Sequence, residues 1–185
     1  MAWTAPFTAI AGGVVRAADY NLYVRDNLLV TEAAVCQTPG SMFITTGLNA
    51  IAERIPTGAF VPDSDTTASA TYTGSLAATS GPSVTVTTGP SAVVCVGARI
   101  GPNTSGSNQS TKMSWSVSGA TTLAASDFWA AGHSGIGNSA VVYTSRWYLA
   151  TGLTPGSNTF SAAYAVSSST VTGTYQYRAL HVIPL

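Results

Sequence analysis

Charged residues are scarce in this sequence. Lys, Arg, Asp and Glu make up 8% of the 185 residues, and seven basic side chains balance seven acidic ones. An ordinary soluble domain carries roughly 25% charged residues. Binding to nucleic acid requires a basic surface that neutralises phosphates, and the sequence contains no cluster of Lys or Arg. The composition predicts no nucleic-acid partner. It favours a chain that is packed into an assembly, because so few charges protect a free monomer poorly against association.

Long apolar runs and closely spaced cysteines are also missing. No run approaches the ~18 apolar residues that a membrane-spanning helix needs. Residues 1–6 contain no basic group, so we expect no secretory signal. Cys36 and Cys95 are too few for a disulfide framework or a zinc site. We therefore expect two buried free thiols, no metal or other cofactor, no membrane partner, and synthesis in the reducing bacterial cytoplasm.

The charges that do occur are concentrated near the start of the chain. Nine of the fourteen lie in residues 1–65, and the remaining 120 residues contain five. The change in composition at residues 62–65 predicts a boundary there. We expect three parts: an N-terminal arm and docking helix (1–38), a connector with short strands (39–65), and an outer β-sandwich domain (66–185).

A single helix is predicted over residues 17–35. This segment contains neither glycine nor proline, whereas Gly12-Gly13 and Pro39-Gly40 lie on either side of it. Its apolar side chains fall on three faces, which carry Ala17, Tyr20, Val24, Leu28 and Val35, then Leu22 and Leu29, then Tyr23 and Val30. A helix that is apolar on several sides is usually covered on several sides. We expect contact with other subunits; the alternative is a helix wedged inside its own domain.

The rest of the sequence alternates in the manner of β-strands. Met113, Trp115 and Val117 would share one face of a strand, and the Ser and Thr residues between apolar positions would face solvent. Glycine–proline pairs and other turn signals separate the apolar segments. This pattern predicts a mainly β fold, an antiparallel β-sandwich of jelly-roll type preceded by the arm and one α-helix. The expected strands cover residues 84–88, 93–100, 112–118, 141–149, 160–166 and 174–183, with shorter ones at 41–47 and 59–61.

Several motifs resemble those of small virion proteins from tailed phages that infect actinobacteria. The opening combines Trp3-Thr4-Ala5-Pro6, Gly13-Val14-Val15 and a helix that contains Arg25-Asp26-Asn27-Leu28. Residues 118–122, 152–160 and the closing Val182-Ile183-Pro184-Leu185 are also similar to those proteins. The resemblance implies a minor tail protein, tail fibre or capsid decoration protein, present in the virion as a homotrimer. It transfers no catalytic residue.

A docking surface is predicted in the opening segment. Trp3 would provide a rigid apolar anchor, and Asp19 and Asn21 would accept hydrogen bonds from the first helical N–H groups. The alternative is that these residues only cap and solvate a local helix. The partners would be other virion proteins, of the capsid or the tail. The expected docking residues are Trp3, Tyr20, Asn21, Leu22, Val24, Arg25, Asp26, Asn27, Leu28 and Leu29.

No convincing catalytic set is visible. Glycoside hydrolysis normally requires two carboxylates, and Asp127 is the one acidic residue after Asp65. Asp127 and His133 could form a triad with a serine, but the Gly-x-Ser-x-Gly motif is missing. We therefore expect no enzymatic activity.

Binding to a host surface glycan remains open. The candidate contacts are Trp129, His133 and Asn138, with His133 to Asn138 as a loop, and Trp147-Tyr148 is a further candidate. The favoured alternative is that these aromatic residues fill the core or a trimer axis. The runner-up function is a secreted or surface carbohydrate-binding β-sandwich module.

Overall fold

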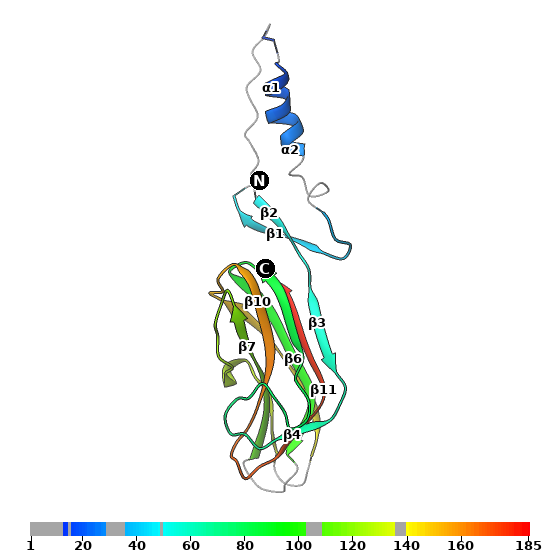
Figure 1. Cartoon of the computed structure of the whole chain (residues 1–185), viewed down its shortest axis with the longest axis vertical. Helices are drawn as coiled ribbons and strands as arrows, with labels where there is room; N and C mark the ends of the chain where they lie inside the picture. Colours follow the sequence, from blue (N-terminus) through cyan, green and yellow to red (C-terminus); the bar gives the residue numbers. More distant parts are fainter. Residues whose placement is uncertain (1–12, 15, 29–35, 49, 103–108, 136–139) are drawn as a thin grey trace. The chain divides into compact units, whose positions relative to one another are not determined.

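A computed structural model describes residues 13–14, 16–28, 36–48, 50–102, 109–135 and 140–185. The chain forms two compact units, residues 1–55 and residues 56–185. The predicted arm lies, up to residue 12, outside the described residues. The two units are drawn in Figure 1.

The described helix of the first unit covers residues 17–28. It consists of α1 (Ala17–Tyr20), a π-helical turn (Asn21–Arg25) and α2 (Asp26–Leu28), which follow one another without a break. Residues 29–35, the second part of the predicted helix, lie outside the described residues. The Asp19 carboxylate accepts a hydrogen bond from Arg16 N–H at 3.3 Å, so it stabilises the helix start as predicted.

A β-hairpin completes the described part of the first unit. β1 (Met42–Gly47) pairs with β2 (Ala50–Arg54), and the Glu53 carboxylate holds the segment that leads into β1. Glu53 Oε1 accepts hydrogen bonds from Ser41 Oγ at 2.6 Å, Thr38 N at 2.7 Å and Gln37 N at 3.1 Å. These bonds, above all that from Ser41, lower the pKa of Glu53. Cys36 is exposed, so the prediction of two buried thiols is wrong for this one; Cys95 is buried.

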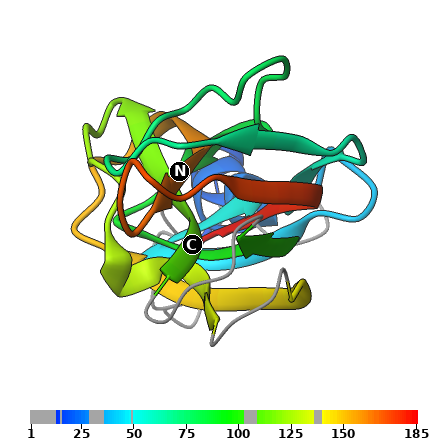
Figure 2. The same ribbon diagram turned by 90° about the horizontal axis from the view of Figure 1, so that it is seen from below.

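The second unit is an antiparallel β-sandwich of two sheets. The four-stranded sheet has the order β5-β10-β7-β8, and the five-stranded sheet has the order β3-β11-β6-β9, with β4 also paired to β11. Figure 2 shows the sandwich from below. Its strands are β3 (Thr57–Val61), β4 (Asp65–Thr67), β5 (Ser83–Thr88), β6 (Ser91–Pro102), β7 (Gln109–Gly119), β8 (Ala131–Gly135), β9 (Val142–Thr151), β10 (Gly156–Val166) and β11 (Gly173–Pro184).

The strand order is that of a jelly roll. β3 and β4 pair with successive parts of β11, so together they form one interrupted edge strand. Counting this pair as the first of eight strands, the sheets have the orders 1-8-3-6 and 2-7-4-5. This arrangement results when a strip of antiparallel strands is folded over twice into two sheets. The predicted mainly β, jelly-roll-like sandwich is confirmed.

The boundary between the units lies earlier than the charge distribution predicted. β3 pairs with β11 from Thr57↔Val182 to Val61↔Arg178, so the sandwich begins at Pro56 and includes residues 56–65 of the expected connector. The earlier part of the connector contains the β1–β2 hairpin. Composition could not reveal this division because β3 belongs to the sheet only through a strand more than a hundred residues further along the chain.

The core between the sheets consists of the inward residues of each strand. Met113, Trp115 and Phe160 of the four-stranded sheet are fully buried, as are Val94 and Leu180 of the five-stranded sheet. The Trp115 ring packs against the rings of Trp129, Tyr148 and Phe160, with centroid separations of 5.1, 6.2 and 5.7 Å. Each such large side chain contributes roughly 1.5–3 kcal/mol by leaving water, which accounts for the predicted alternation.

A polar network is buried at the interrupted edge strand. Asp65 is 7% exposed, and its carboxylate accepts hydrogen bonds from the Thr79 hydroxyl at 2.7 Å and from the N–H groups of Thr66, Ala78 and Thr79. The buried Arg178 donates to the same Thr79 hydroxyl at 2.8 Å and to Asp63 O at 3.3 Å. Burial alone would raise the pKa of Asp65, but these hydrogen bonds lower it to about 2.

Acid should destabilise the protein through Asp65. A carboxyl whose pKa is lowered by folding stabilises the fold above its unfolded pKa, near 4, and loses that contribution as the pH falls toward 2. We expect a loss of roughly 2 kcal/mol in the free energy of unfolding over this interval, measured by urea denaturation at constant protein concentration. Asp65→Asn should be less stable at neutral pH and should lack this part of the pH dependence. An unchanged pH dependence in Asp65→Asn would contradict the assignment.

Candidate functional site

The two sheets of the sandwich have unlike outer surfaces. On the four-stranded sheet the outward residues are mostly serine and threonine, as the alternation predicted. Their hydroxyls pair across strands, Ser83 with Ser161 and Thr85 with Thr159, both at 2.8 Å. Such a surface remains hydrated and has little tendency to associate.

The outer surface of the five-stranded sheet is apolar instead. The register places Leu149, Val93 and Ile183 in one row across β9, β6 and β11, and Trp147, Cys95 and His181 in the next. The following rows contain the aromatic residues Tyr143, Tyr177 and Phe60. We call this surface the aromatic face. Its large exposed side chains, with their exposed fractions, are Phe60 (58%), Tyr143 (73%), Trp147 (60%), Leu149 (52%) and Tyr177 (41%).

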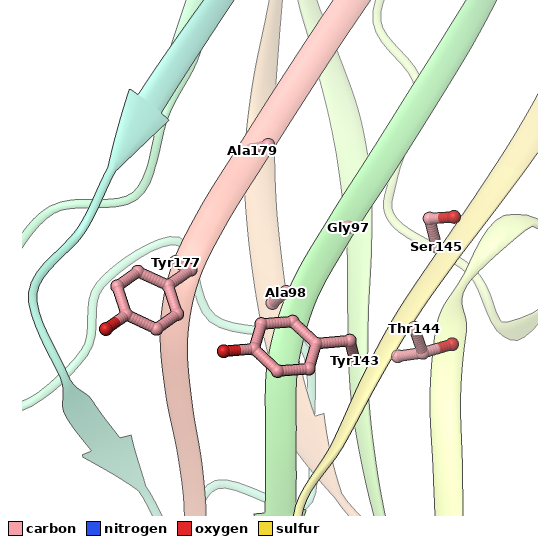
Figure 3. Close-up of a pocket in the computed structure, with 7 residues that line it drawn as sticks. All are labelled: Gly97, Ala98, Tyr143, Thr144, Ser145, Tyr177 and Ala179. Atoms are coloured by element: carbon pink, nitrogen blue, oxygen red, sulfur yellow. The ribbon is translucent and has the colours of Figure 1, made fainter.

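Three rings of the aromatic face are nearly parallel. The centroids of Phe60 and Tyr177 are 6.5 Å apart with 4° between ring planes, and those of Tyr177 and Tyr143 are 6.2 Å apart with 9°. Figure 3 shows Tyr143 and Tyr177 on the same side of the sheet. The three residues come from β3, β11 and β9, so the row exists only because these strands share one sheet.

A shallow hollow of about 290 Å³ lies beside this row. Figure 3 shows it above β6 and β11, where Gly97 and Ala179 leave the backbone uncovered. A Cβ at Gly97 would lie 3.1 Å from Ser145 Cβ and 3.2 Å from Thr144 O, closer than nearly all such contacts. The small residues therefore let β6 and β9 approach and leave a recess between larger aromatic residues.

A β-bulge in β11 places Tyr177 on the aromatic face. The pairing of β11 with β6 is interrupted between Gln176 and Ala179, and Tyr177 has φ = 53°. The extra residue allows Arg178 to point into the core while Tyr177 points outward. A bulky residue in the left-handed region costs of order 1–3 kcal/mol, and such strain is concentrated at functional positions. The strained backbone at Tyr177 therefore marks this surface as a candidate functional site.

The aromatic face carries little charge. Arg99 lies on it, and its Nη1 donates to Gln176 Oε1 at 2.7 Å. What the surface offers is ring faces, tyrosine hydroxyls and aliphatic side chains, a combination suited to burial against another apolar surface.

The predicted glycan contacts do not form one site. Trp129 closes the edge of the core: its ring packs on Trp115 and Tyr148, and its Nε1–H donates to Trp115 O at 3.0 Å. His133 lies in β8, so the prediction of a loop starting there is wrong; it pairs with Thr111 of β7. Asn138 lies outside the described residues.

Asp127 is engaged by residues other than His133. Its Oδ1 accepts a hydrogen bond from the Tyr72 hydroxyl at 2.6 Å, and its Oδ2 accepts one from Lys112 Nζ at 2.7 Å. Lys112, followed by Tyr72, lowers the pKa of Asp127. In a catalytic triad the carboxylate accepts a hydrogen bond from the histidine. Here the two Asp127 oxygens accept hydrogen bonds from Tyr72 and Lys112 instead. Within the described residues no group of three His, Cys, Asp or Glu side chains could hold a metal ion.

The described docking residues lie on the helix of the first unit. Tyr20, Leu22, Val24 and Leu28 are more than a third exposed, whereas Asn27 is 3% exposed and its Nδ2 donates to Tyr23 O at 2.9 Å. The charges of Arg25 and Asp26 pair with each other at 2.7 Å. Asn21 lies in the π-helical turn, past the start of the helix. Trp3 and Leu29 lie outside the described residues, and the docking role stays a prediction.

Sequence reasoning missed most of the aromatic face. The sequence predicts Trp147 as a possible contact residue, but it does not predict Phe60, Tyr143 or Tyr177 as part of an exposed surface. One available signal was the segment 141–149, in which Tyr143, Trp147 and Leu149 occupy alternate positions while Tyr148 occupies the other face. A strand that is apolar on both faces is usually covered on both faces. This pattern indicates that the outer face of the segment contacts another surface.

No model of a known protein family matches the sequence, and a search of curated proteins finds no significant relative. In the described part of the chain, no helix is long and apolar enough to cross a membrane.

Proposed function

We propose that this chain is a non-enzymatic structural protein of a tailed-phage particle. Three copies of the sandwich associate through the aromatic face, and the N-terminal segment docks onto capsid or tail proteins as a minor tail, fibre or decoration component. The single observation that carries this proposal is the aromatic face itself. Five large apolar side chains are more than 40% exposed on one sheet, while the other sheet presents hydroxyls.

The chemistry of the aromatic face favours contact with the same face of other copies of this chain. Its arginine side chain, Arg99, donates a hydrogen bond to the Gln176 amide, so the guanidinium keeps a polar partner when another copy covers the face. A contiguous apolar patch of this kind is unusual on a monomeric protein and typical of an interface between subunits. The strained backbone at Tyr177 keeps one ring of the row outward, as an interface residue requires.

The helix of the first unit supports the docking role. Exposed Tyr20, Leu22 and Leu28 offer apolar area, and burying side chains of this size contributes roughly 1.5–3 kcal/mol each. The Arg25–Asp26 pair is already neutralised, so its burial against a partner costs less than that of a lone charge. The resemblance of the opening motif to actinobacteriophage virion proteins supports the same role.

The proposal is tested on purified particles of the phage that encodes the chain. We expect mass spectrometry to find the protein in the particles, and antibody labelling viewed by electron microscopy to mark one structure. Label over the head would support a decoration protein, and label on the tail would support a fibre or minor tail protein. Absence from purified particles would overturn the virion proposal.

A carbohydrate-binding module is the second candidate function. The row of three nearly parallel rings favours it, because sugar rings pack on aromatic faces. This candidate predicts a chain that is absent from particles and is monomeric when purified. The particle experiment and the mass in solution separate the two.

A further inference from the structure

The open edge of the sandwich between β8 and β9 gathers an unusual share of the charge. β8 and β9 are edge strands of opposite sheets and contact each other. Of the five charged residues after Asp65, three line a hollow there: Lys112, Asp127 and Arg146. In a sandwich with so few charges, this concentration on one surface calls for an explanation.

The surface consists of two adjoining hollows, which we call the edge groove. One, of about 300 Å³, is lined by Ser126, Asp127, Phe128 and Arg146. The other, of about 280 Å³, also includes Asp127 and Arg146 and adds Lys112, His133 and Ser134. Each hollow is of a size that holds one sugar ring, and the Asp127 and Arg146 side chains stand at their junction.

Arg146 provides a guanidinium that no other described residue binds. It pairs with Val96, whose side chain lies in the core, so its own side chain leaves β9 on the inward side and emerges exposed at the open edge. Among the described residues it has no hydrogen-bond or ion-pair partner. Arg99, Lys112 and Arg178, by contrast, each donate to a neighbour.

Phe128 is presented to solvent by a rigid turn. Its side chain is 78% exposed, although the next residue, Trp129, is packed into the core. The Ser126 hydroxyl accepts a hydrogen bond from Phe128 N at 3.2 Å, and Ala130 N donates to Asp127 O at 3.3 Å. The turn is therefore anchored on both sides of the ring. An exposed aromatic ring on such a turn, beside hydrogen-bonding groups, is suited to packing against the apolar face of a sugar.

The Asp127 carboxylate is held in position by the protein. Lys112 Nζ and the Tyr72 hydroxyl fix its two oxygens, and the pairing keeps it ionised. A carboxylate oxygen can accept more than one hydrogen bond, so Asp127 can also accept from sugar hydroxyls. His133 Nε2 is shielded from solvent and has no partner among the described residues, which adds a polar atom next to the second hollow.

We propose that the edge groove binds a saccharide that carries a carboxylate group. Phe128 packs against the sugar ring, Arg146 pairs with the carboxylate, and Asp127 accepts hydrogen bonds from ring hydroxyls. With Lys112 and Arg146 against Asp127, the groove has a surplus positive charge, and a guanidinium matches the two oxygens of a carboxylate. This binding is a property of the single sandwich and does not depend on the virion proposal.

Two sugars that differ in one group provide the test. Methyl glucuronide and methyl glucoside differ only in having a carboxylate or a hydroxymethyl group on the ring. We expect calorimetric titration of the full-length protein at low salt to give a dissociation constant about tenfold lower for the glucuronide. Saturation-transfer NMR should show the sugar ring protons in contact with the protein. Equal affinity for the two sugars, or no binding of either, would overturn the proposal.

Variants assign the binding to the groove. Arg146→Gln should remove the preference for the glucuronide and leave the affinity for the glucoside unchanged. Phe128→Ala should lower the affinity for both sugars. Arg16→Gln, which changes an exposed arginine of the first unit outside the docking residues, is the matched control and should change binding of neither sugar. If Arg146→Gln keeps the preference, or if acetate competes as well as the glucuronide, the groove is not a saccharide site. The Arg146 and Phe128 side chains are both exposed, so their substitution should leave the unfolding temperature of the protein unchanged.

Discussion

Replacing Tyr143 and Trp147 together with aspartate should convert the proposed trimer into a monomer. In the free sandwich these side chains are 73% and 60% exposed, so the substitution removes little from the core and the sandwich should still fold. In the proposed trimer each new carboxylate would be buried against an apolar surface without a partner. Such burial costs several kcal/mol for each charge, and this cost adds to the contacts that the interface loses with the two rings.

Mass in solution measures this effect. Light scattering after gel filtration should give the natural protein a mass about three times the 18.8 kDa of the chain and the double variant the mass of one chain. Thr85→Asp/Thr87→Asp is the control, because it introduces the same two charges at exposed positions of the hydroxyl-covered sheet. A folded double variant that stays trimeric, or a natural protein that is monomeric at micromolar concentration, would refute association through the aromatic face.

The core-facing residues of the sandwich could be predicted from the sequence, because the alternation that identifies them lies within each strand. Met113, Trp115 and Val117 alternate with small polar residues, and period-2 alternation specifies both the strand and its buried face. The same holds for Phe160 and Tyr164. Turn residues between such segments then give the number of strands and the sandwich class, which is why the jelly-roll prediction could be made without knowing any pairing.

The aromatic face and the edge groove could not be predicted in the same way, because both depend on register. Phe60, Tyr143 and Tyr177 are far apart in the sequence and become neighbours only when β3, β11 and β9 join one sheet. No local sequence pattern predicts the β-bulge that places the Tyr177 side chain on the outer face. Asp127 and Arg146 likewise meet because a short turn of one sheet lies against an edge strand of the other.

The short strand β3 shows how pairing can override composition. Residues 57–61 lie within the charged part of the chain and within the predicted connector, where the sequence predicts a short strand at 59–61. Their main-chain groups bond to β11, and Ala59 packs against the core. A segment of five residues therefore belongs to the sandwich by its hydrogen bonds, and this decides where a truncation can be made.

A chain shortened to residues 56–185 should fold and form the trimer but fail to enter phage particles. It keeps every strand of the sandwich, including β3, and it keeps the aromatic face. It lacks the helix with exposed Tyr20, Leu22 and Leu28, which the docking proposal requires. Loss of three such contacts, at roughly 1.5–3 kcal/mol each, should reduce incorporation more than a hundredfold.

Complementation measures this incorporation directly. Phage that lacks the gene is grown in cells that supply either the full-length or the shortened chain, and the copies per purified particle are counted by quantitative mass spectrometry. The full-length variant Leu22→Asp/Leu28→Asp, which changes two exposed side chains, should fail in the same way, and this separates docking from the mere loss of chain length. Incorporation of the shortened trimer at the full-length level would show that the particle holds the sandwich itself. The aromatic face or the hydroxyl-covered sheet would then have to carry the attachment, and the first unit would need another role.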